Sequence, residues 1–341
     1  MTKIRRLQNE NAGFVNDVSN VIATEAWKNP ALFPDLSKNK TLFVFSDYSR
    51  VKGKYKTYSF LIVGRSDADY FNGARKILRA KYNLKNRRMS YKGLNDKIKL
   101  KALPDFLSCA GAMNGVIVTF VVDTQIKYMF ADQFLDIWPE LSKVNKRTLE
   151  DMLRVVHFGA QAIMTVFSSS QNIVWFTDSD AIVANEEHEQ LFGKLAETMI
   201  RHMFLPHEEI KHIVFGLSAI DDGSLEIEDF VAVPDLIAGA LCETLDQLNQ
   251  ANLKIISQIA LNKPEVTEKT NFICGWLGNS AHPLKKFGVV FDKTGIQKWD
   301  FRPTFFTIQN VNSISRERSH NVVNLKAYPS DPIRFDIEER N

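Results

Sequence analysis

The sequence predicts an α/β fold in which helices flank a mixed β-sheet, and two features lead to this expectation. Short runs rich in β-branched and aromatic residues, typical of buried strands, occur at 41–46, 55–63, 116–122, 172–177 and 213–217. Segments with helical character lie between these runs. The chain has 341 residues, of which 45% are hydrophobic and 24% charged, so it is long and apolar enough to bury a substantial core.

The first two strands are expected to form a hairpin. Residues 1–40 are interpreted as an irregular or helical lead-in, interrupted by Asn29-Pro30 and Phe33-Pro34. The run TLFVFS at 41–46 predicts the first strand, and YKTYSFLIV at 55–63 predicts the second. Because only a short turn separates the two runs, we expect them to pair in an antiparallel arrangement.

Two helices are expected before the third strand. The first covers 67–81, with Ser66 or Asp67 as its N-cap. The second covers 94–110 and is expected to be interrupted near Pro104. The run VIVTFVV at 116–122 has strong β-propensity and predicts the third strand.

The middle of the chain is expected to alternate helices with strands. A long helical stretch is predicted over 125–166, with breaks near Pro139 and Val144, and a helix over 187–203 separates the last two strands. Pro234 is expected near the start of a further helix, since proline is tolerated in the first turn.

The predicted organisation has three parts. They are the lead-in 1–40, a core over 41–249 and a C-terminal extension or subdomain over 250–341, where short apolar pieces alternate with Gly, Pro and Asn. The many aromatic residues of the last part predict that it packs against the core or a partner.

Several classes of protein are excluded or disfavoured by the sequence. No uncharged apolar stretch is long enough for a transmembrane helix, so we expect no membrane partner, and the N-terminus leads into no apolar signal segment. The cysteines Cys109, Cys242 and Cys274 lie far apart, which argues against a zinc ribbon and fits a reducing cytoplasm. The phosphate-binding motif G-x-x-x-x-G-K-[ST] and the serine-hydrolase motif G-x-S-x-G are both missing.

Charge is unevenly distributed along the chain. The segment 75–101 carries eleven basic residues against Asp96 alone, whereas 178–246 carries sixteen acidic residues against three basic ones. Basic side chains that hold phosphates, facing carboxylates that hold cations, are what a metal-dependent nuclease needs. Both runs can also be solvated helix faces, which is the usual role of such runs. Arg87, Arg88 and Lys92 are the candidate nucleic-acid contacts in the basic run.

Aspartates follow or end several predicted strands. Asp47 follows the first strand, Asp123 ends the third, Asp178 and Asp180 end the fourth, and Asp235 opens the helix after Pro234. The backbone of a strand end can aim a carboxylate rigidly, and a two-metal site with Mg²⁺ or Mn²⁺ needs a few such carboxylates. Each aspartate alone is more commonly a turn or capping residue, and Asp235 can also be a first-turn acid favoured by the helix dipole.

The order of four short motifs resembles a family. The motifs are SDYS at 46–49, SYKG at 90–93, TDSD at 177–180 and VPDLIAGA at 233–240. Together they resemble an RNase H-like (RuvC-like) family of bacteria and phages, a domain of unknown function whose members carry "DESG", a mid-chain Lys, "IDE" and "ADLIAGA" in this order. The resemblance spans roughly 41–247 and implies an RNase H-like core with metal-binding acids at Asp47, Asp178 or Asp180, and Asp235.

The departures from the family pattern are specific. Tyr48 stands where the family has a Glu beside its first aspartate, and Ser179 stands where it has a Glu after the second, with Asp180 one residue further on. The resemblance implies a Mg²⁺- or Mn²⁺-dependent nuclease or a related phosphodiester-processing enzyme, a hydrolase. The alternative is a catalytically degraded RNase H-like module that binds nucleic acid or a protein partner.

Overall fold

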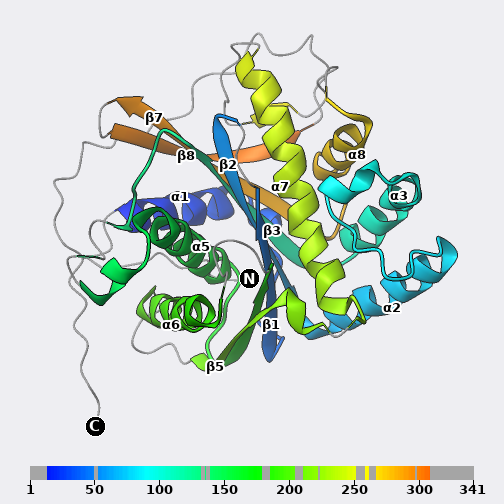
Figure 1. Ribbon diagram of the computed structural model, residues 1–341, viewed down its shortest axis with the longest axis horizontal. Coiled ribbons are helices and arrows are strands. Elements are labelled where there is room, and N and C mark those ends of the chain that lie inside the picture. Colours follow the sequence, from blue (N-terminus) through cyan, green and yellow to red (C-terminus); the bar gives the residue numbers. More distant parts are fainter. Residues whose placement is uncertain are drawn as a thin grey trace.

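The fold is built around one mixed β-sheet (Figure 1). The structure is a computed structural model that describes residues 14–307 apart from 50–52, 132–134, 136–138, 179–184, 204–209, 222, 251–257, 261–265 and 296–297. The strands lie in the order β5-β4-β1-β2-β3-β7-β8-β6. Their bounds are β1 Thr41–Tyr48, β2 Tyr55–Gly64, β3 Gly115–Asp123, β4 Gln171–Thr177, β5 Ile210–Leu217, β6 Gln258–Ala260, β7 Lys285–Gly295 and β8 Lys298–Thr307. These bounds confirm the five predicted strands and the α/β class.

Antiparallel and parallel pairing meet at β1. On one side β1, β2 and β3 form an antiparallel meander, which confirms the expected hairpin. On the other side β4 runs parallel to β1, and β5 runs parallel to β4. The ends of β1, β4 and β5 therefore reach the same edge of the sheet.

Helices cover both faces of the sheet (Figure 1). One face packs against α1, α5 and α6, and the other against α2, α3, α7 and α8. Successive side chains of a strand point to opposite faces. Val44 therefore joins the core cluster on the α5 side, and Phe45 joins the core cluster on the α7 side. The helix bounds are α1 Phe14–Lys28, α2 Arg65–Lys81, α3 Lys97–Gly111, α5 Lys146–Met164, α6 Glu186–Met203, α7 Glu226–Gln250 and α8 Glu268–Leu277. None of the helices described is long and apolar enough to cross a bilayer.

Two expectations for the helices before β3 are wrong. The helix α3 is not interrupted, and Pro104 lies within it while Leu103 and Phe106 stay buried on either side. The N-cap of α2 is Gly64, and no side chain caps it. The Asp67 carboxylate instead accepts a hydrogen bond from Asn114 N at 2.7 Å, so it secures the turn that leads into β3.

The predicted helical stretch 125–166 is broken near Val144 as expected: a 3₁₀-helix at Pro139–Lys143 lies before the break, and helix α5 follows it. Helix α5 begins at Lys146, after the N-cap Asn145. The buried Glu150 carboxylate accepts hydrogen bonds from the backbone N–H groups of Met129, Phe130 and Ala131. The Glu150 side chain therefore satisfies these three backbone donors, of which Ala131 is itself helical.

The described residues beyond α7 extend the same sheet. Strand β7 pairs in parallel with β3, and β8 pairs with β7 in antiparallel fashion. Phe287 and Phe291 are fully buried, and the Phe291 ring lies 5.4 Å from that of Phe158 in α5. The Phe272 side chain of α8 stays 44% exposed.

Replacing Phe291 should therefore destabilise the whole molecule. Phe291→Ala is expected to lower the free energy of unfolding by about 3–5 kcal/mol, because the cavity cannot collapse between β7 and α5. Urea unfolding with an unchanged m-value measures this. Phe272→Ala is the matched control and should lower the free energy of unfolding far less, because the side chain is partly exposed. If both changes lower it by the same small amount, β7 is not part of the core.

Candidate functional site

Two aspartates lie side by side because β1 and β4 are parallel neighbours. The register pairs Ser46 with Thr177, so Asp47 and Asp178 follow at the same level of the sheet. Phe45, two residues before Asp47, belongs to the core cluster on the α7 side. The alternation of side chains then directs Asp47 to the same side, under α7.

Helix α7 supplies the third carboxylate. Asp235 lies well inside this helix, which begins at Glu226 and contains Pro234, so the expectation that Asp235 opens a helix is wrong. A first-turn role in the helix dipole is excluded for the same reason. The Asp235 carboxylate accepts a hydrogen bond from Tyr91 N at 2.6 Å, and it lies within hydrogen-bonding reach of the Asp47 carboxyl group.

Burial raises the pKa of both of these carboxyl groups, and the negative charge of Asp178 adds to the rise in each. Burial is the main cause of the raised pKa of Asp47, and the negative charges of Asp235 and Asp178 add to it. Burial also raises the pKa of Asp235. The backbone N–H of Tyr48 donates to Asp47 at 2.6 Å and offsets part of the effect. Carboxylates crowded in this way require a proton or a cation among them.

Arg88 is the basic side chain that meets this cluster. Its Nη2 lies 2.8 Å from Asp178 Oδ1, and its Nε lies 2.5 Å from Glu228 Oε2 without the alignment of a hydrogen bond. The positive charge of Arg88 opposes the rise in pKa of Asp47 and Asp235. Ser218, which follows β5, also donates from Oγ to Asp178 Oδ1, at 3.1 Å.

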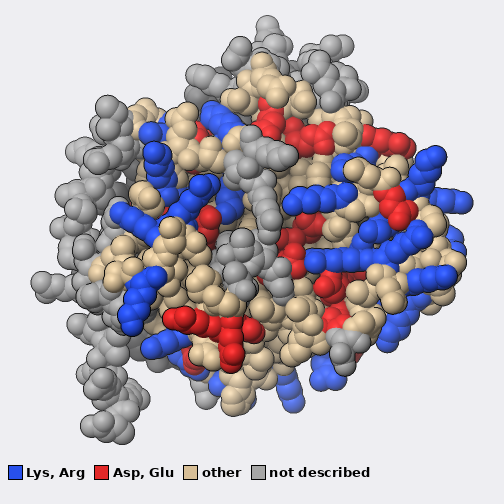
Figure 2. Space-filling view, in the orientation of Figure 1, with Lys and Arg blue, Asp and Glu red and all other residues tan. Residues whose placement is uncertain are grey.

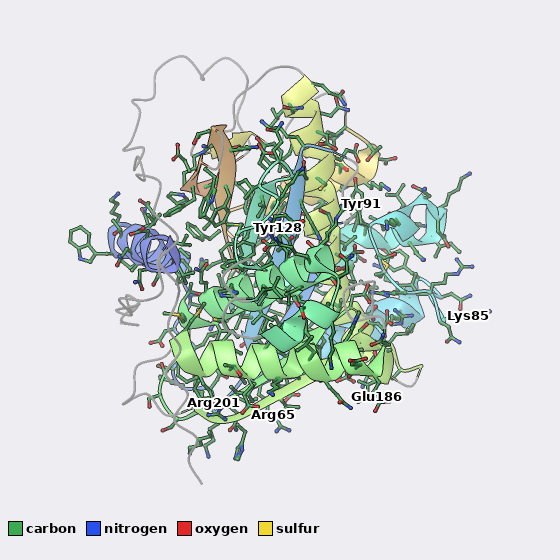
Figure 3. All side chains as sticks on the ribbon, turned by 60° about the vertical axis from the view of Figure 1, so that its left-hand side comes forward. Arg65, Lys85, Tyr91, Tyr128, Glu186 and Arg201 are labelled. Carbon is green, nitrogen blue, oxygen red and sulfur yellow. The ribbon has the colours of Figure 1, made fainter. Side chains whose placement is uncertain are left out.

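Tyr91 holds the segment that carries Arg88 in place. In Figure 3, Tyr91 lies beside α7. Its hydroxyl hydrogen-bonds to Glu243, and Lys269 Nζ lies 4.3 Å from the centre of its ring. A Cβ atom on Gly239 would come within 2.2 Å of the ring. The glycine of the VPDLIAGA motif is therefore needed because the Tyr91 ring packs directly on the α7 backbone.

The structure brings together three of the four predicted acids. Asp47, Asp178 and Asp235 converge, whereas Asp180 lies outside the described residues. Asp123 reaches the same edge of the sheet two strands away and accepts a hydrogen bond from Gln125 N at 2.9 Å, so it serves as a turn cap. Its Oδ2 also lies 3.9 Å from Lys54 Nζ, so Asp123 forms an ion pair with Lys54 as well.

Tyr48 faces away from the acids. It belongs to the core cluster on the α5 side of the sheet, and its ring centre lies 6.1 Å from that of Tyr58. A side chain at position 48 points to the opposite face from Asp47. The departure from the family pattern at Tyr48 therefore removes no carboxylate from the vicinity of Asp47, while Ser179 lies outside the described residues.

The basic run divides into internal ion pairs and an exposed surface. Arg75 and Arg79 both pair with the fully buried Asp229 at 2.9 Å. Arg87 and Lys92 are exposed, and Arg87 Nη1 lies 3.2 Å from Asp96. Figure 2 shows blue side chains gathered over α2 and α3 beside a red strip, and Figure 3 shows Lys85 at the outer edge. The exposed basic residues are Lys76, Lys81, Lys85, Arg87, Lys92, Lys97 and Lys101.

Sequence reasoning missed Glu228 and the role of Tyr91. Glu228 lies seven residues before Asp235, which places both on one face of a helix, and this spacing was a usable signal. It was hidden because the helix was expected to start at Pro234. Tyr91 contributes its backbone N–H, and no sequence pattern reports a backbone contact of this kind.

The carboxylates do not form a finished metal centre as they stand. Among the residues described, no group of three or more His, Cys, Asp or Glu side chains is arranged so that it could hold a metal ion. A separate hollow of about 680 Å³ lies between α3 and α8, lined in part by Leu107, Phe272, Trp276 and His282. None of the predicted acids lines it, so we place the candidate chemistry at the carboxylates.

Comparison with known proteins gives no assignment. No protein-family model matches the chain, and no curated protein matches it. Its function is therefore inferred from the carboxylates and the basic side chains around them.

The raised pKa of Asp47 predicts how stability depends on pH. The folded protein binds more protons than the unfolded chain between the unfolded pKa, about 4, and the raised folded pKa. The free energy of unfolding should therefore fall as pH rises through this window. Asp47→Asn removes this loss, so the variant should be more stable than wild type at pH 7 when a chelator is present.

Urea unfolding from pH 4 to pH 8 measures the effect. Asp123→Asn is the control, because it removes a carboxylate from the same edge of the sheet. Its free energy of unfolding should fall slightly, because the turn cap is weakened. If Asp47→Asn is less stable than wild type at pH 7, its partners stabilise the ionised Asp47 carboxylate. The predicted fall in stability with rising pH is then wrong.

Proposed function

We propose that the protein is a divalent-metal-dependent nuclease, or a related phosphodiester-processing enzyme, that acts on nucleic acid. The observation that carries the proposal is the convergence of Asp47, Asp178 and Asp235, which come from β1, β4 and α7. These are the aspartates that the family resemblance selects. A basic surface lies next to them, over α2 and α3 (Figure 2).

An RNase H-like core is part of the proposal. The antiparallel meander of β1, β2 and β3, continued by the parallel strands β4 and β5, is compatible with such a core. The four motifs of the resemblance also support it, because all four meet in space, with Asp178 of the TDSD motif at the level of Asp47. Asp47, Tyr91 and Asp235 are members of three different motifs, and both Asp47 and Tyr91 approach Asp235.

The chemistry of the donors fits Mg²⁺ or Mn²⁺. Both ions prefer carboxylate oxygens, and two of the three aspartates have a raised pKa because their charges are buried close together. Asp47, Asp178 and Asp235 would hold the ion, although Asp178 now pairs with Arg88. When bound, the ion would act as a Lewis acid on the phosphodiester and activate water for attack.

The residues of the chain itself have distinct roles in this proposal. The Tyr91 N–H keeps the Oδ2 atom of Asp235 oriented through a hydrogen bond. Arg87 and Lys92 are exposed next to this segment and would hold the phosphate backbone. Arg88 contributes positive charge at the carboxylates themselves.

One observation favours the second candidate function, a non-catalytic module that binds nucleic acid or a protein partner. Arg88 already provides a positive charge to Asp178 and Glu228, so the carboxylates have a counter-ion without a metal. A module of this kind would bind no Mn²⁺ through Asp47 and would keep its partner when Asp47 is replaced.

Replacing Asp47 tests catalysis directly. Asp47→Asn keeps the shape of the side chain but removes the charge that attracts the cation, so cleavage should slow by roughly 10³-fold. Asp235→Asn should behave in the same way, and Asp123→Asn is the control with a milder effect. The assay is cleavage of a panel of DNA and RNA, single- and double-stranded, with Mg²⁺ or Mn²⁺.

Two results would count against the nuclease. If wild type binds no divalent metal in calorimetry and cleaves nothing, the protein is the binding module. If wild type cleaves and Asp47→Asn cleaves equally well, the active site lies elsewhere in the molecule.

Replacing the exposed basic pair tests nucleic-acid binding. Arg87→Gln combined with Lys92→Gln should weaken binding and make the slope of log K against log salt concentration shallower, by roughly 0.7 to 0.9 for each phosphate that is no longer neutralised. Fluorescence anisotropy across a salt series measures this slope. The control replaces Lys194 and Arg201, two exposed basic residues of α6 on the other face of the sheet. If both double variants give the same slope, Arg87 and Lys92 do not contact nucleic acid and face only solvent.

A further inference from the structure

Arg88 occupies the position where a cation is needed. Its guanidinium contacts Asp178 and Glu228 together, and its charge also acts on Asp47 and Asp235. The Arg88 side chain is 32% exposed, so part of it is reachable from solvent, although its Nε is buried. A positive side chain held among acids in this way competes with any other cation for the same oxygens.

The backbone around Arg88 is anchored on both sides. Leu84 and Met89 are fully buried in the core cluster on the α7 side. Tyr91 is tied to Asp235 through its N–H, and Lys269 Nζ donates to its carbonyl oxygen at 3.1 Å. Only the long side chain of Arg88 is therefore able to move away from the acids without unfolding the segment.

A phosphate is a suitable alternative partner for the guanidinium. Arginine binds phosphate with two parallel N–H donors, in the same way that it binds a carboxylate. The exposed Arg87 and Lys92 lie on the same short segment and would bring a phosphate backbone close to Arg88. Asp178 would then lose its counter-ion and be open to a divalent cation.

We propose that Arg88 couples the binding of nucleic acid to the binding of the divalent cation at Asp178. Phosphate draws the Arg88 side chain away from Asp178 and Glu228, and the cation takes its place. Without nucleic acid, Arg88 competes with the cation and weakens its binding. This inference rests on the proposed function and adds a regulation of the same site.

Thermodynamic linkage makes the coupling reciprocal. If nucleic acid raises the affinity for Mn²⁺ by some factor, Mn²⁺ raises the affinity for nucleic acid by the same factor. Couplings between two sites in one protein are typically about 5- to 150-fold. The exchange of a single arginine should lie near the lower part of this range, at roughly tenfold.

The first experiment uses Mn²⁺ alone on the full chain. Free Mn²⁺ is measured by its electron paramagnetic resonance signal, so no turnover is needed. Arg88→Gln should bind Mn²⁺ roughly tenfold more tightly than wild type, because the competing charge is gone. Arg88→Lys keeps the charge and should stay close to wild type. Arg87→Gln is the matched control: it removes the same charge one residue away, where Asp96 is the partner, and should leave Mn²⁺ affinity unchanged.

The second experiment tests the coupling on wild type first. The Mn²⁺ titration of wild type is repeated with a saturating 20-nucleotide single-stranded DNA, and then with RNA of the same sequence, under conditions in which a gel shows no cleavage. Binding of Mn²⁺ to each oligonucleotide alone is subtracted. At least one of the two should tighten Mn²⁺ binding to wild type, and neither should do so in Arg88→Gln.

The outcomes separate this inference from the proposed function. If wild type binds Mn²⁺ and Arg88→Gln binds it no more tightly, the coupling is wrong while the metal site stands. The coupling is also wrong, and the metal site also stands, if wild type binds Mn²⁺ and neither oligonucleotide changes its affinity. If neither wild type nor Arg88→Gln binds Mn²⁺, both the inference and the metal-dependent function are overturned.

Discussion

The parallel pairing of β1 with β4 is the constraint on which the rest of the site depends. It brings Asp47 and Asp178 to the same level at one edge of the sheet, where Asp47 is buried close to Asp235 of α7 and Asp178 is half-buried. Buried carboxylates at this spacing repel one another and lose their hydration. The surrounding structure must therefore supply compensation, and it does so with backbone N–H groups and with the charge of Arg88.

The segment between α2 and α3 provides this compensation and is itself held by α7. The Tyr91 ring packs on Gly239, and the Tyr91 N–H binds Asp235, so one residue ties the segment to the helix and to the acid at once. The Arg75 and Arg79 pairs with buried Asp229 attach the end of α2 to the beginning of α7. The position of Arg88 is thus fixed by contacts at both ends of the segment.

The carboxylate cluster costs stability, and an apolar edge would fold more easily. Apolar residues of similar volume usually replace buried charges without loss of stability. Three aspartates at this edge of the sheet are therefore better explained by a function than by folding, and cation binding is the function that we propose for them. The same logic does not extend to Asp123, whose carboxylate caps a turn and forms an ion pair with Lys54.

The sequence by itself determined the strands, because β-branched and aromatic runs specify buried extended segments locally. It also placed Asp47 and Asp178 at the ends of strands. Phe45, two residues before Asp47, indicates the face of the sheet on which Asp47 lies, and Thr177 precedes Asp178 directly. Only the tertiary structure decided the start of α7, since Pro234 reads locally as a helix start while long-range packing extends the helix back to Glu226. It also decided the different fates of Arg87 and Arg88. Adjacent residues of one type look alike in sequence, and the partner that each one meets is set by how the chain folds around it.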